Sequence, residues 1–247
     1  MKLLIFAGTT EGRRLCERAL ARGCRVTAAV ATEYGGALLP HDARLTVHTG
    51  RMDARAMAEH LRGACYDAVV DATHPYAVEV SRNLRAACAE TGARYVRLLR
   101  AESRAEGCVY LPSLAEACAA ADDTEGAVLA ATGSKEIAAY TAIRGWRERV
   151  YARVLPTEES LALCAAAGLD ARHILAGKGP FSYEENARVM RQYEIRLMIT
   201  KDGGAEGGFL DKVRAAHDCG AAVFVVARPS ETGYSYDEVA RMVEEGF

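Results

Sequence analysis

Short apolar runs alternate with longer amphipathic segments along nearly the whole chain. The runs at residues 3–7, 68–72 and 222–226 have the length of strands, and in the segments between such runs apolar residues recur with the period of a helix. This alternation is typical of a parallel sheet whose two faces are covered by helices. The pattern therefore predicts an α/β fold throughout the sequence.

The alternation forms two series, which are separated by a segment without clear periodicity at residues 99–112. In the first series we expect strands at residues 3–7, 25–31, 45–48, 68–72 and 95–98, and helices at 11–22, 53–62 and 77–91. In the second we expect strands at 127–131, 149–154, 173–175, 197–200 and 222–226, and helices at 114–121, 158–166, 183–192, 208–219 and 236–245. We interpret them as two Rossmann-like lobes, residues 1–105 and 106–247, joined by residues 99–112 and with a ligand cleft between them.

The first apolar run leads directly into the loop Gly8-Thr9-Thr10-Glu11-Gly12-Arg13, after which a helix is expected. Glycine lets a backbone approach an anion closely, and the N–H groups at the start of a helix attract negative charge. The loop is therefore a candidate phosphate-binding turn for a dinucleotide. Its glycine spacing is not G-x-G-x-x-G, so a simple tight turn between strand and helix is the alternative.

Two charged residues bear on which dinucleotide this loop could bind. Glu33 follows the second expected strand, about 20 residues after the loop, where a carboxylate can bond the ribose 2′-hydroxyl of NADH. Arg51, after the third expected strand, could instead neutralise the 2′-phosphate of NADPH. The alternative for Glu33 is a solvated loop residue.

Polar and aromatic side chains gather after the fourth expected strand, in the segment Asp71-Ala72-Thr73-His74-Pro75-Tyr76-Ala77. His74 and Tyr76 are candidate catalytic residues, because an imidazole and a phenol can each donate a proton. Pro75 suits the first turn of the helix expected next. The alternative for His74 is a histidine that only caps this helix.

Cations recur at the strand ends of the second series. Lys135, Lys178 and Lys201 lie in glycine-containing loops after three expected strands, and Arg153 and Arg228 lie at the ends of two others. Because the carboxyl ends of parallel strands share one edge of a sheet, we expect a cationic rim that suits a ligand with several carboxylates or phosphates. The alternative for each of these residues is a solvated surface cation.

The 247 residues carry 31 Lys and Arg against 33 Asp and Glu, so any anionic ligand must meet a local cluster, and nucleic acid is not an expected partner. No stretch approaches the roughly 20 apolar residues that cross a bilayer, and the first apolar run is too short for a signal peptide. We therefore expect a cytoplasmic protein with no membrane partner. The eight cysteines form no C-x-x-C pair and are expected to be buried thiols, not metal ligands.

Five segments together make the sequence resemble the precorrin-6A reductase family of cobalamin biosynthesis, which includes the cobalt-precorrin-6A reductases. The segments are the loop at residues 8–13, the segment at 71–77, Thr132-Gly133-Ser134-Lys135, Gly179-Pro180-Phe181-Ser182 and Thr200-Lys201-Asp202-Gly203-Gly204. The resemblance extends over the full length, and the segment at 71–77 is its most specific part. Where members often have Ser-Gly after the lysine, this chain has Asp202-Gly203.

The resemblance implies an oxidoreductase that uses NADH or NADPH to reduce one double bond of a polyanionic tetrapyrrole. Hydride would go to ring carbon 19 while carbon 18 is protonated, which converts precorrin-6A or cobalt-precorrin-6A to the 6B form. Residues 8–13 would then bind the dinucleotide, and Thr73, as a further cofactor-binding residue, would lie near its nicotinamide together with His74 and Tyr76. The five strand-end cations would bind substrate carboxylates, assisted by Ser182 and by the backbone of Gly203 and Gly204. A water or a substrate carboxyl group could replace His74 and Tyr76 as the proton donor.

Two other functions stay open at this point. A short-chain dehydrogenase also opens with a strand and a glycine loop, but no tyrosine of this chain is followed four places later by the lysine that such enzymes use. A non-catalytic sensor would bind the dinucleotide without consuming it. The sequence also leaves open the choice between NADH and NADPH, whether the substrate contains cobalt, and the oligomeric state.

Overall fold

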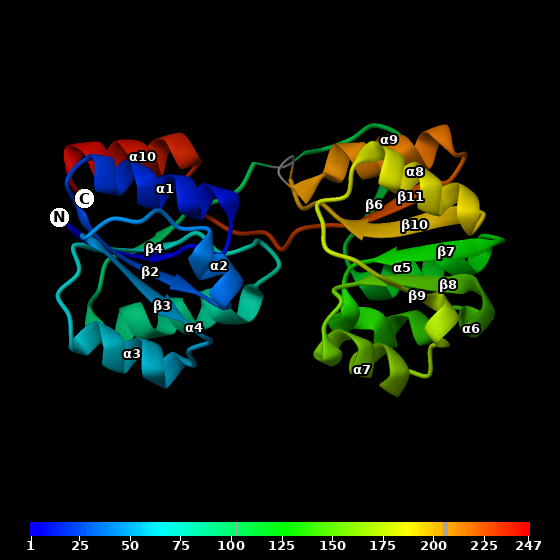
Figure 1. Ribbon diagram of the computed structural model, residues 1–247, viewed down its shortest axis with the longest axis horizontal. Helices are drawn as coiled ribbons and strands as arrows, with labels where there is room; N and C mark the ends of the chain where they lie inside the picture. The colour runs from blue at the N-terminus through cyan, green and yellow to red at the C-terminus, as the bar shows by residue number, and fades with distance from the viewer. Residues whose placement is uncertain (102, 205–206) are drawn as a thin grey trace. The chain divides into compact units, whose positions relative to one another are not determined.

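A computed structural model describes residues 1–101, 103–204 and 207–247 (Figure 1). The chain forms two compact units: Met1–Ala101 together with Pro229–Phe247 make the first, and residues 102–228 make the second. This division differs from the expected boundary between residues 105 and 106, which assigned the last helix to the second domain. The difference arises because the chain returns to the first unit after it has completed the second.

The first unit contains a five-stranded parallel sheet with the order β3-β2-β1-β4-β5. Its strands are β1 (Lys2–Phe6), β2 (Arg25–Val30), β3 (Leu45–Thr49), β4 (Ala68–Asp71) and β5 (Tyr95–Arg97). Its helices are α1 (Thr10–Ala21), α2 (Glu33–Ala37), α3 (Ala54–Arg62), α4 (Val78–Thr91) and α10 (Tyr236–Glu245).

Helices cover both faces of this sheet because its central strands are apolar on both sides. In β1, Leu3 and Ile5 pack in the same cluster as residues of α1 and α10. Leu4 and Phe6 point the other way and pack with residues of α3 and α4. Figure 1 shows these two helix layers, with α1 and α10 on one side of the strands and α3 and α4 on the other.

The returning segment extends the first sheet beyond β5. Tyr234 forms a parallel bridge with Leu98. The N–H of Tyr234 donates to the carbonyl oxygen of Arg97 at 2.8 Å, and the N–H of Leu99 donates to the carbonyl oxygen of Tyr234 at 2.8 Å. A Cβ on Gly233 would lie only 2.7 Å from that Arg97 oxygen, so this close approach requires glycine.

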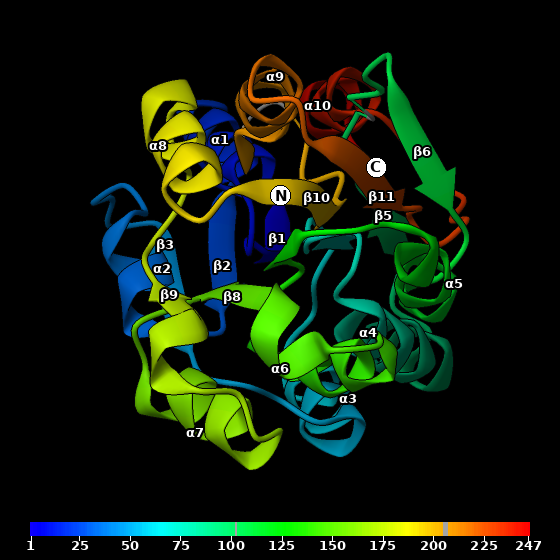
Figure 2. The ribbon, with the colours of Figure 1, turned by 90° about the vertical axis from the view of Figure 1, so that its right-hand side faces the viewer.

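The second unit contains a six-stranded parallel sheet with the order β6-β11-β10-β7-β8-β9. Its strands are β6 (Cys108–Leu111), β7 (Ala127–Ala131), β8 (Val150–Val154), β9 (Ile174–Ala176), β10 (Ile195–Lys201) and β11 (Ala222–Val226). Its helices are α5 (Leu114–Ala120), α6 (Trp146–Arg149), α7 (Glu158–Ala166), α8 (Tyr183–Gln192) and α9 (Phe209–Asp218). Figure 2 shows α8 and α9 on one face of this sheet and α5, α6 and α7 on the other.

Most elements begin and end within two residues of their predicted bounds. The pattern missed β6, which lies inside the segment 99–112 that we interpreted as a connection. β6 is an edge strand whose Val109 and Tyr110 are exposed, so it lacks a buried apolar run. The pattern also missed the short helices α2 and α6 and the 3-10 helix Ser134–Ala142, which are too short or too irregular to show a helical period.

All eight cysteines are free thiols. Five are buried as expected, but Cys65 is exposed and Cys108 and Cys219 are half-buried. No helix in the described part of the chain is both long and apolar enough to cross a bilayer.

Candidate functional site

The glycine loop joins β1 to α1, and Thr9 fixes its conformation. The Thr9 hydroxyl accepts a hydrogen bond from the N–H of Gly12 at 3.1 Å, which caps α1, and donates to the carbonyl oxygen of Ala72 at 2.9 Å. A Cβ on Gly12 would lie 2.8 Å from the Cα of Ala7, so only glycine lets α1 begin this close to the end of β1. Because the loop itself uses the Thr9 hydroxyl, a ligand contact at Thr9 would come from the backbone.

Gly8 is exposed at the start of this loop. A Cβ on Gly8 would lie 3.8 Å from the Cα of Thr73, so the structure brings the glycine loop next to the segment 71–77. The first N–H groups of α1 and the positive end of its dipole face the loop. An anion can therefore approach the start of α1 over a residue that has no side chain.

Neighbouring side chains hold two charged or polar residues of the loop. The Glu11 carboxylate pairs with Arg100 through an Nη2–Oε2 distance of 2.6 Å and an Nε–Oε1 distance of 2.8 Å. Burial alone would raise the pKa of Glu11, but the hydrogen bonds and charge of Arg100 outweigh it and lower this pKa. Arg13 donates to the Thr10 hydroxyl at 3.3 Å. We did not predict Arg100, because it lies in the segment without periodicity.

A buried charged network fixes the segment after β4. Asp71 accepts hydrogen bonds from the Thr73 hydroxyl at 2.7 Å and the Tyr95 hydroxyl at 2.8 Å, and it pairs with Arg97 at 3.0 Å. Arg97 also donates to the Thr73 carbonyl oxygen at 3.0 Å and pairs with Glu231 at 2.8 Å. Burial alone would raise the pKa of Asp71, but Arg97 and the hydroxyl donors lower it. The network therefore holds Thr73 through both its side chain and its backbone.

His74 and Tyr76 lie in a turn that precedes α4. The N–H of Ala77 donates to the carbonyl oxygen of His74 at 2.8 Å, and the helix begins only at Val78. We expected Pro75 in the first turn of this helix, but it lies before the helix, which begins one residue after the predicted start. The N-cap residue of α4 is Ala77, which makes no side-chain capping hydrogen bond, so His74 does not occupy the cap position. The rings of His74 and Tyr76 are half-buried with centroids 5.6 Å apart, so the two candidate proton donors are neighbours.

Glu33 and Arg51 follow two neighbouring strands of the first sheet. Glu33 is the first residue of α2, shortly after β2, and Arg51 follows β3, with which β2 pairs. A Cβ on Gly36 would lie 3.4 Å from the Thr49 hydroxyl, so α2 packs on the end of β3. Both charged side chains are exposed. They lie at the same edge of the sheet as the glycine loop.

The five predicted cations of the second unit share one sheet edge. Arg153 lies near the end of β8 and Lys201 ends β10, whereas Lys135, Lys178 and Arg228 follow β7, β9 and β11. These five strands are consecutive neighbours and run parallel, so their carboxyl ends meet at one edge. The predicted common edge is therefore confirmed.

The lysines at this edge differ in their environments. Lys135 and Lys178 are exposed. Lys201 pairs with Glu136 through an Nζ–Oε2 distance of 2.7 Å. Part of the Lys201 charge is therefore neutralised within the protein, which the sequence did not show.

Asp202 organises the loop after β10. Its carboxylate accepts hydrogen bonds from the N–H groups of Gly204 at 2.8 Å and Ser103 at 3.0 Å, and it pairs with Arg228 at 3.2 Å. Arg228 also donates through Nε to the Asp202 carbonyl oxygen at 3.1 Å. The Gly204 N–H and the Arg228 charge therefore stabilise this loop, which reduces what they can offer to a ligand. Gly203 is half-buried beside them.

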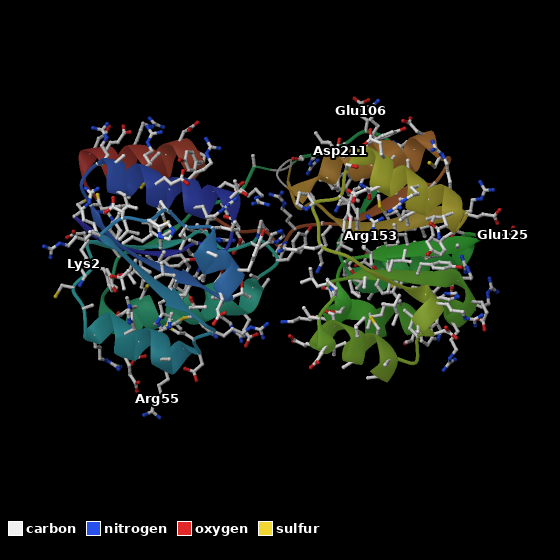
Figure 3. The ribbon with its side chains drawn as sticks, in the orientation of Figure 1. Lys2, Arg55, Glu106, Glu125, Arg153 and Asp211 are labelled. Atoms are coloured by element: carbon white, nitrogen blue, oxygen red, sulfur yellow. The ribbon has the colours of Figure 1, made fainter. Side chains whose placement is uncertain are left out.

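Arg153 carries a guanidinium whose closest partners are neutral. Its Nη1 lies 2.5 Å from the amide oxygen of Asn186, and its Cζ lies 4.4 Å from the centroid of the Phe181 ring. The Asn186 amide is held by the carbonyl oxygens of Phe181 and Ser182 at 3.0 and 2.7 Å. Burial lowers the pKa of Arg153 to about 10. Figure 3 shows Arg153 inside this unit, whereas Arg55 projects from α3.

Lys212 on α9 is a sixth cation at this edge, and we did not predict it. Its Nζ lies 3.4 Å from the Thr200 hydroxyl, and burial together with the positive charge of Arg153 lowers its pKa to about 8. Within the described part of the chain, neither Lys212 nor Arg153 forms an ion pair with a carboxylate. The sequence does contain one signal for Lys212. It lies three residues after Phe209 and next to Val213, and this spacing puts it on the buried side of α9.

Ser182 begins α8 and has a structural role. Its hydroxyl accepts from the N–H of Glu185 at 3.2 Å, and the Glu185 carboxylate accepts from the N–H of Ser182 at 2.8 Å. This capping box satisfies two N–H groups at the start of the helix. Ser235 and Glu238 form the same arrangement at the start of α10.

Comparisons with known proteins agree with the resemblance seen in the sequence. The family described as precorrin-6x reductase CbiJ/CobK matches residues 2–245. The cobalt-precorrin-6A reductase of Salmonella typhimurium is 37% identical over 233 residues, which cover 92% of this chain and 88% of that protein. The cobalt-precorrin-6A reductase of Methanothermobacter thermautotrophicus is 34% identical over 234 residues, which cover 93% of this chain and 77% of that protein.

A solved structure described as CobK precorrin-6A reductase has the same fold, with a TM-score of 0.78 and 26% sequence identity over 100% of this chain and 98% of that one. The predicted α/β fold with two parallel sheets is therefore confirmed. The family match also favours a reductase over a dinucleotide sensor or a short-chain dehydrogenase. The chain belongs to the precorrin-6x reductase family CbiJ/CobK.

Proposed function

We propose that this protein catalyses the reduction of precorrin-6A or cobalt-precorrin-6A to the 6B form, with NADH or NADPH as the reductant, in the cytoplasmic synthesis of cobalamin. The observation that carries this proposal is the family match over residues 2–245, which includes both sheets and every candidate site residue. The chain contributes a nucleotide-type turn in its first unit and a cationic sheet edge in its second, and each suits one of the two reactants.

The first unit is the proposed dinucleotide domain. The exposed Gly8 and the close packing at Gly12 let the start of α1 meet a pyrophosphate through backbone N–H groups. Thr9 holds this loop against the end of β4, which keeps the N–H groups in place before a ligand arrives. The dinucleotide, when bound, supplies the hydride.

The second unit is the proposed substrate domain. The substrate class carries several acetate and propionate groups, and a carboxylate binds most strongly to a cation that has no competing carboxylate partner. Among the residues that the structure describes, Arg153 and Lys212 meet this condition, since their hydrogen-bond partners are Asn186 and Thr200. This cationic surface is enlarged by four further residues at the same edge: the exposed Lys135 and Lys178, and the ion-paired Lys201 and Arg228.

The turn after Thr73 is the proposed source of the proton. Adding a hydride to one ring carbon requires a proton at the adjacent carbon, and an imidazole or a phenol can donate it. His74 and Tyr76 are neighbours in this turn. The network around Asp71 and Arg97 holds Thr73, the residue just before this turn.

The test is an anaerobic assay in which the absorbance of the reduced nicotinamide is followed after precorrin-6A or cobalt-precorrin-6A is added. We expect the absorbance to fall while the tetrapyrrole gains two hydrogens by mass spectrometry. A protein that binds both molecules and leaves the absorbance unchanged would be a sensor, and the proposal would be wrong. Comparing the two tetrapyrroles at equal concentration shows whether cobalt is required.

Glu33 is the proposed determinant of cofactor preference. Its exposed carboxylate at the start of α2 suits the ribose hydroxyls of NADH and repels a 2′-phosphate. Glu33→Ala should therefore raise kcat/KM for NADPH relative to NADH, by about tenfold for an effect near 1.4 kcal/mol. If this variant kept the wild-type cofactor preference, Glu33 would not be part of the site. Arg51→Gln tests the alternative, in which Arg51 binds the 2′-phosphate of NADPH.

A further inference from the structure

The ion pair between Glu11 and Arg100 lies at the start of α1, in the loop to which we assign the pyrophosphate. The two side chains are far apart in the sequence, and they are joined by two hydrogen bonds of 2.6 and 2.8 Å. The exposed fractions of the side chains are 14% for Glu11 and 9% for Arg100. This pair is therefore shielded from water, unlike the pair between Arg18 and Glu244 at the other end of the same helix.

An acidic side chain in this position poses an electrostatic problem. Glu11 lies in the first turn of α1, between Thr9 and Gly12. When no anion is bound, a carboxylate there stabilises the helix, because its negative charge complements the positive end of the helix dipole. For a diphosphate bound at the same place, an uncompensated carboxylate adds repulsion that falls off only slowly in a partly buried site.

We propose that Arg100 is a positioning residue of the dinucleotide site: it pairs with Glu11, neutralises the carboxylate and keeps it away from the anion that binds at the start of α1. The proposal rests on the proposed function, because it assumes that this loop binds the dinucleotide. It adds a role for a residue outside the loop. Arg100 acts through Glu11 and does not itself need to touch the ligand.

The geometry supports neutralisation more than simple cross-linking. Two nitrogens of Arg100 donate to the two oxygens of the same carboxylate, so the pair is bidentate and leaves neither Glu11 oxygen without a donor. The net effect on Glu11 is a pKa below the ordinary value, so the carboxyl stays ionised, paired and oriented at neutral pH. The positive charge of Arg100 therefore balances the negative charge of Glu11 toward an anion that binds at this loop.

A double-mutant cycle on the full chain tests the proposal. Dissociation constants for NADH and NADPH are measured by fluorescence titration for the wild type, E11Q, R100Q and the double variant E11Q/R100Q. We expect R100Q to weaken binding about tenfold or more, because it exposes the carboxylate. E11Q should tighten binding about twofold to threefold, and E11Q/R100Q should return to within about threefold of the wild type.

Two further readouts separate this electrostatic role from a structural one. The defect of R100Q should shrink at high ionic strength, because salt screens the repulsion. It should also shrink when the pH is lowered far enough to protonate Glu11, because protonation removes the negative charge. Arg100→Lys, which keeps the positive charge, should recover most of the affinity lost in R100Q.

Arg18→Gln is the matched control, because it breaks the exposed pair with Glu244 on the same helix. It should change the dissociation constants less than twofold. Thermal unfolding of every variant checks that the protein is folded at the assay temperature.

Three results would overturn the proposal. A double variant as weak as R100Q would mean that Arg100 binds the dinucleotide directly. Equal losses in E11Q and R100Q would mean that the pair only links two segments. Wild-type protein that binds neither dinucleotide would contradict the proposed function itself, and the role of Arg100 would fall with it.

Discussion

The two units build the same kind of parallel sheet but differ in how the buried cations at its carboxyl edge are partnered. In the first unit the charged groups neutralise one another: Asp71 pairs with Arg97, and Glu11 pairs with Arg100. In the second unit Lys201 pairs with Glu136 and Arg228 pairs with Asp202, but Arg153 meets the neutral Asn186. The contrast shows how one architecture can present backbone donors at one site and side-chain cations at another.

The difference follows from what each proposed ligand offers. A pyrophosphate can be bound by backbone N–H groups if the loop is rigid, so buried ion pairs that fix the loop are useful there. Carboxylates at the rim of a macrocycle lie far apart, so they need separate cations on separate strands. Keeping such cations without carboxylate partners costs stability in the absence of ligand.

The largest expected effect separates the two units by stability. Arg97→Met leaves the Asp71 carboxylate buried without its cation, and such a loss costs about 3–5 kcal/mol. Arg153→Met leaves only the neutral oxygen of the buried Asn186 without its donor, so it should cost less, about 1–3 kcal/mol. Urea unfolding measures the loss of stability in each variant. Far-UV circular dichroism follows the whole protein, and the fluorescence of Trp146, the single tryptophan, follows the second unit.

Equal losses in Arg97→Met and Arg153→Met would break the comparison. If Arg97→Met also shifted the Trp146 transition, the two units would unfold as one and the assignment of the loss to the first unit would fail.

The next effect concerns pH and Lys212. The pKa of Lys212 is about 8 in the folded protein against an ordinary 10.5, so the unfolded chain binds more protons between these values. The free energy of unfolding should therefore rise as the pH increases from about 8 to about 10.5, by of the order of 2 kcal/mol. Lys212→Met should abolish this rise, which urea titrations at several pH values measure.

Lys135→Met is the matched control. Because Lys135 is exposed, this variant should keep the pH dependence of unfolding that the wild type shows.

The affinity of the wild type for the tetrapyrrole should fall as the pH rises through about 8, because Lys212 loses its charge. Affinity that is constant over this range would remove Lys212 from the proposed substrate site.

A smaller effect tests the backbone packing of the first unit. Gly12→Ala puts a Cβ 2.8 Å from the Cα of Ala7 and 3.1 Å from the Cβ of Ala72. Displacing α1 should cost about 1–2 kcal/mol, even though alanine favours helix more than glycine does. The same variant should weaken dinucleotide binding. Gly63→Ala is the control, because the nearest atom to its new Cβ would lie 3.6 Å away. Thermal unfolding should show no measurable change in stability for this variant, and titration should show no change in dinucleotide affinity.

The smallest effect compares the two capping boxes. Ser182→Ala and Ser235→Ala each remove the acceptor for the N–H three residues later, and each should cost about 1 kcal/mol in thermal unfolding. If Ser182→Ala weakened tetrapyrrole binding more than Ser235→Ala at equal loss of stability, the Ser182 hydroxyl would also contact the substrate.

The regular part of the fold could be predicted because strand burial and helix period leave direct traces in the sequence. Val69 and Val70 lie in an apolar run, and Thr9 marks the start of a helix. The carboxyl edge of the second sheet was also predictable, since parallel strands put Lys201 and Arg153 on the same side.

The pairing of charges could not be predicted, because it depends on contacts between distant segments. Nothing near Arg97 in the sequence indicates that Glu231 will reach it from the returning segment. For the same reason Arg228 looked available for a ligand until the structure paired it with Asp202. Lys212 was missed because a lysine on a helix is usually solvated, and only its buried face distinguishes it.

The return of residues 229–247 to the first unit has a consequence for biosynthesis. Glu231 and the apolar face of α10 leave the ribosome only after the whole second unit has been made. Until then Arg97 lacks one of its two carboxylate partners, and the side of the sheet that α10 covers stays open to water. The unit that is begun first is thus completed last, so we expect nascent chains to hold a folded second unit beside an unfinished first one.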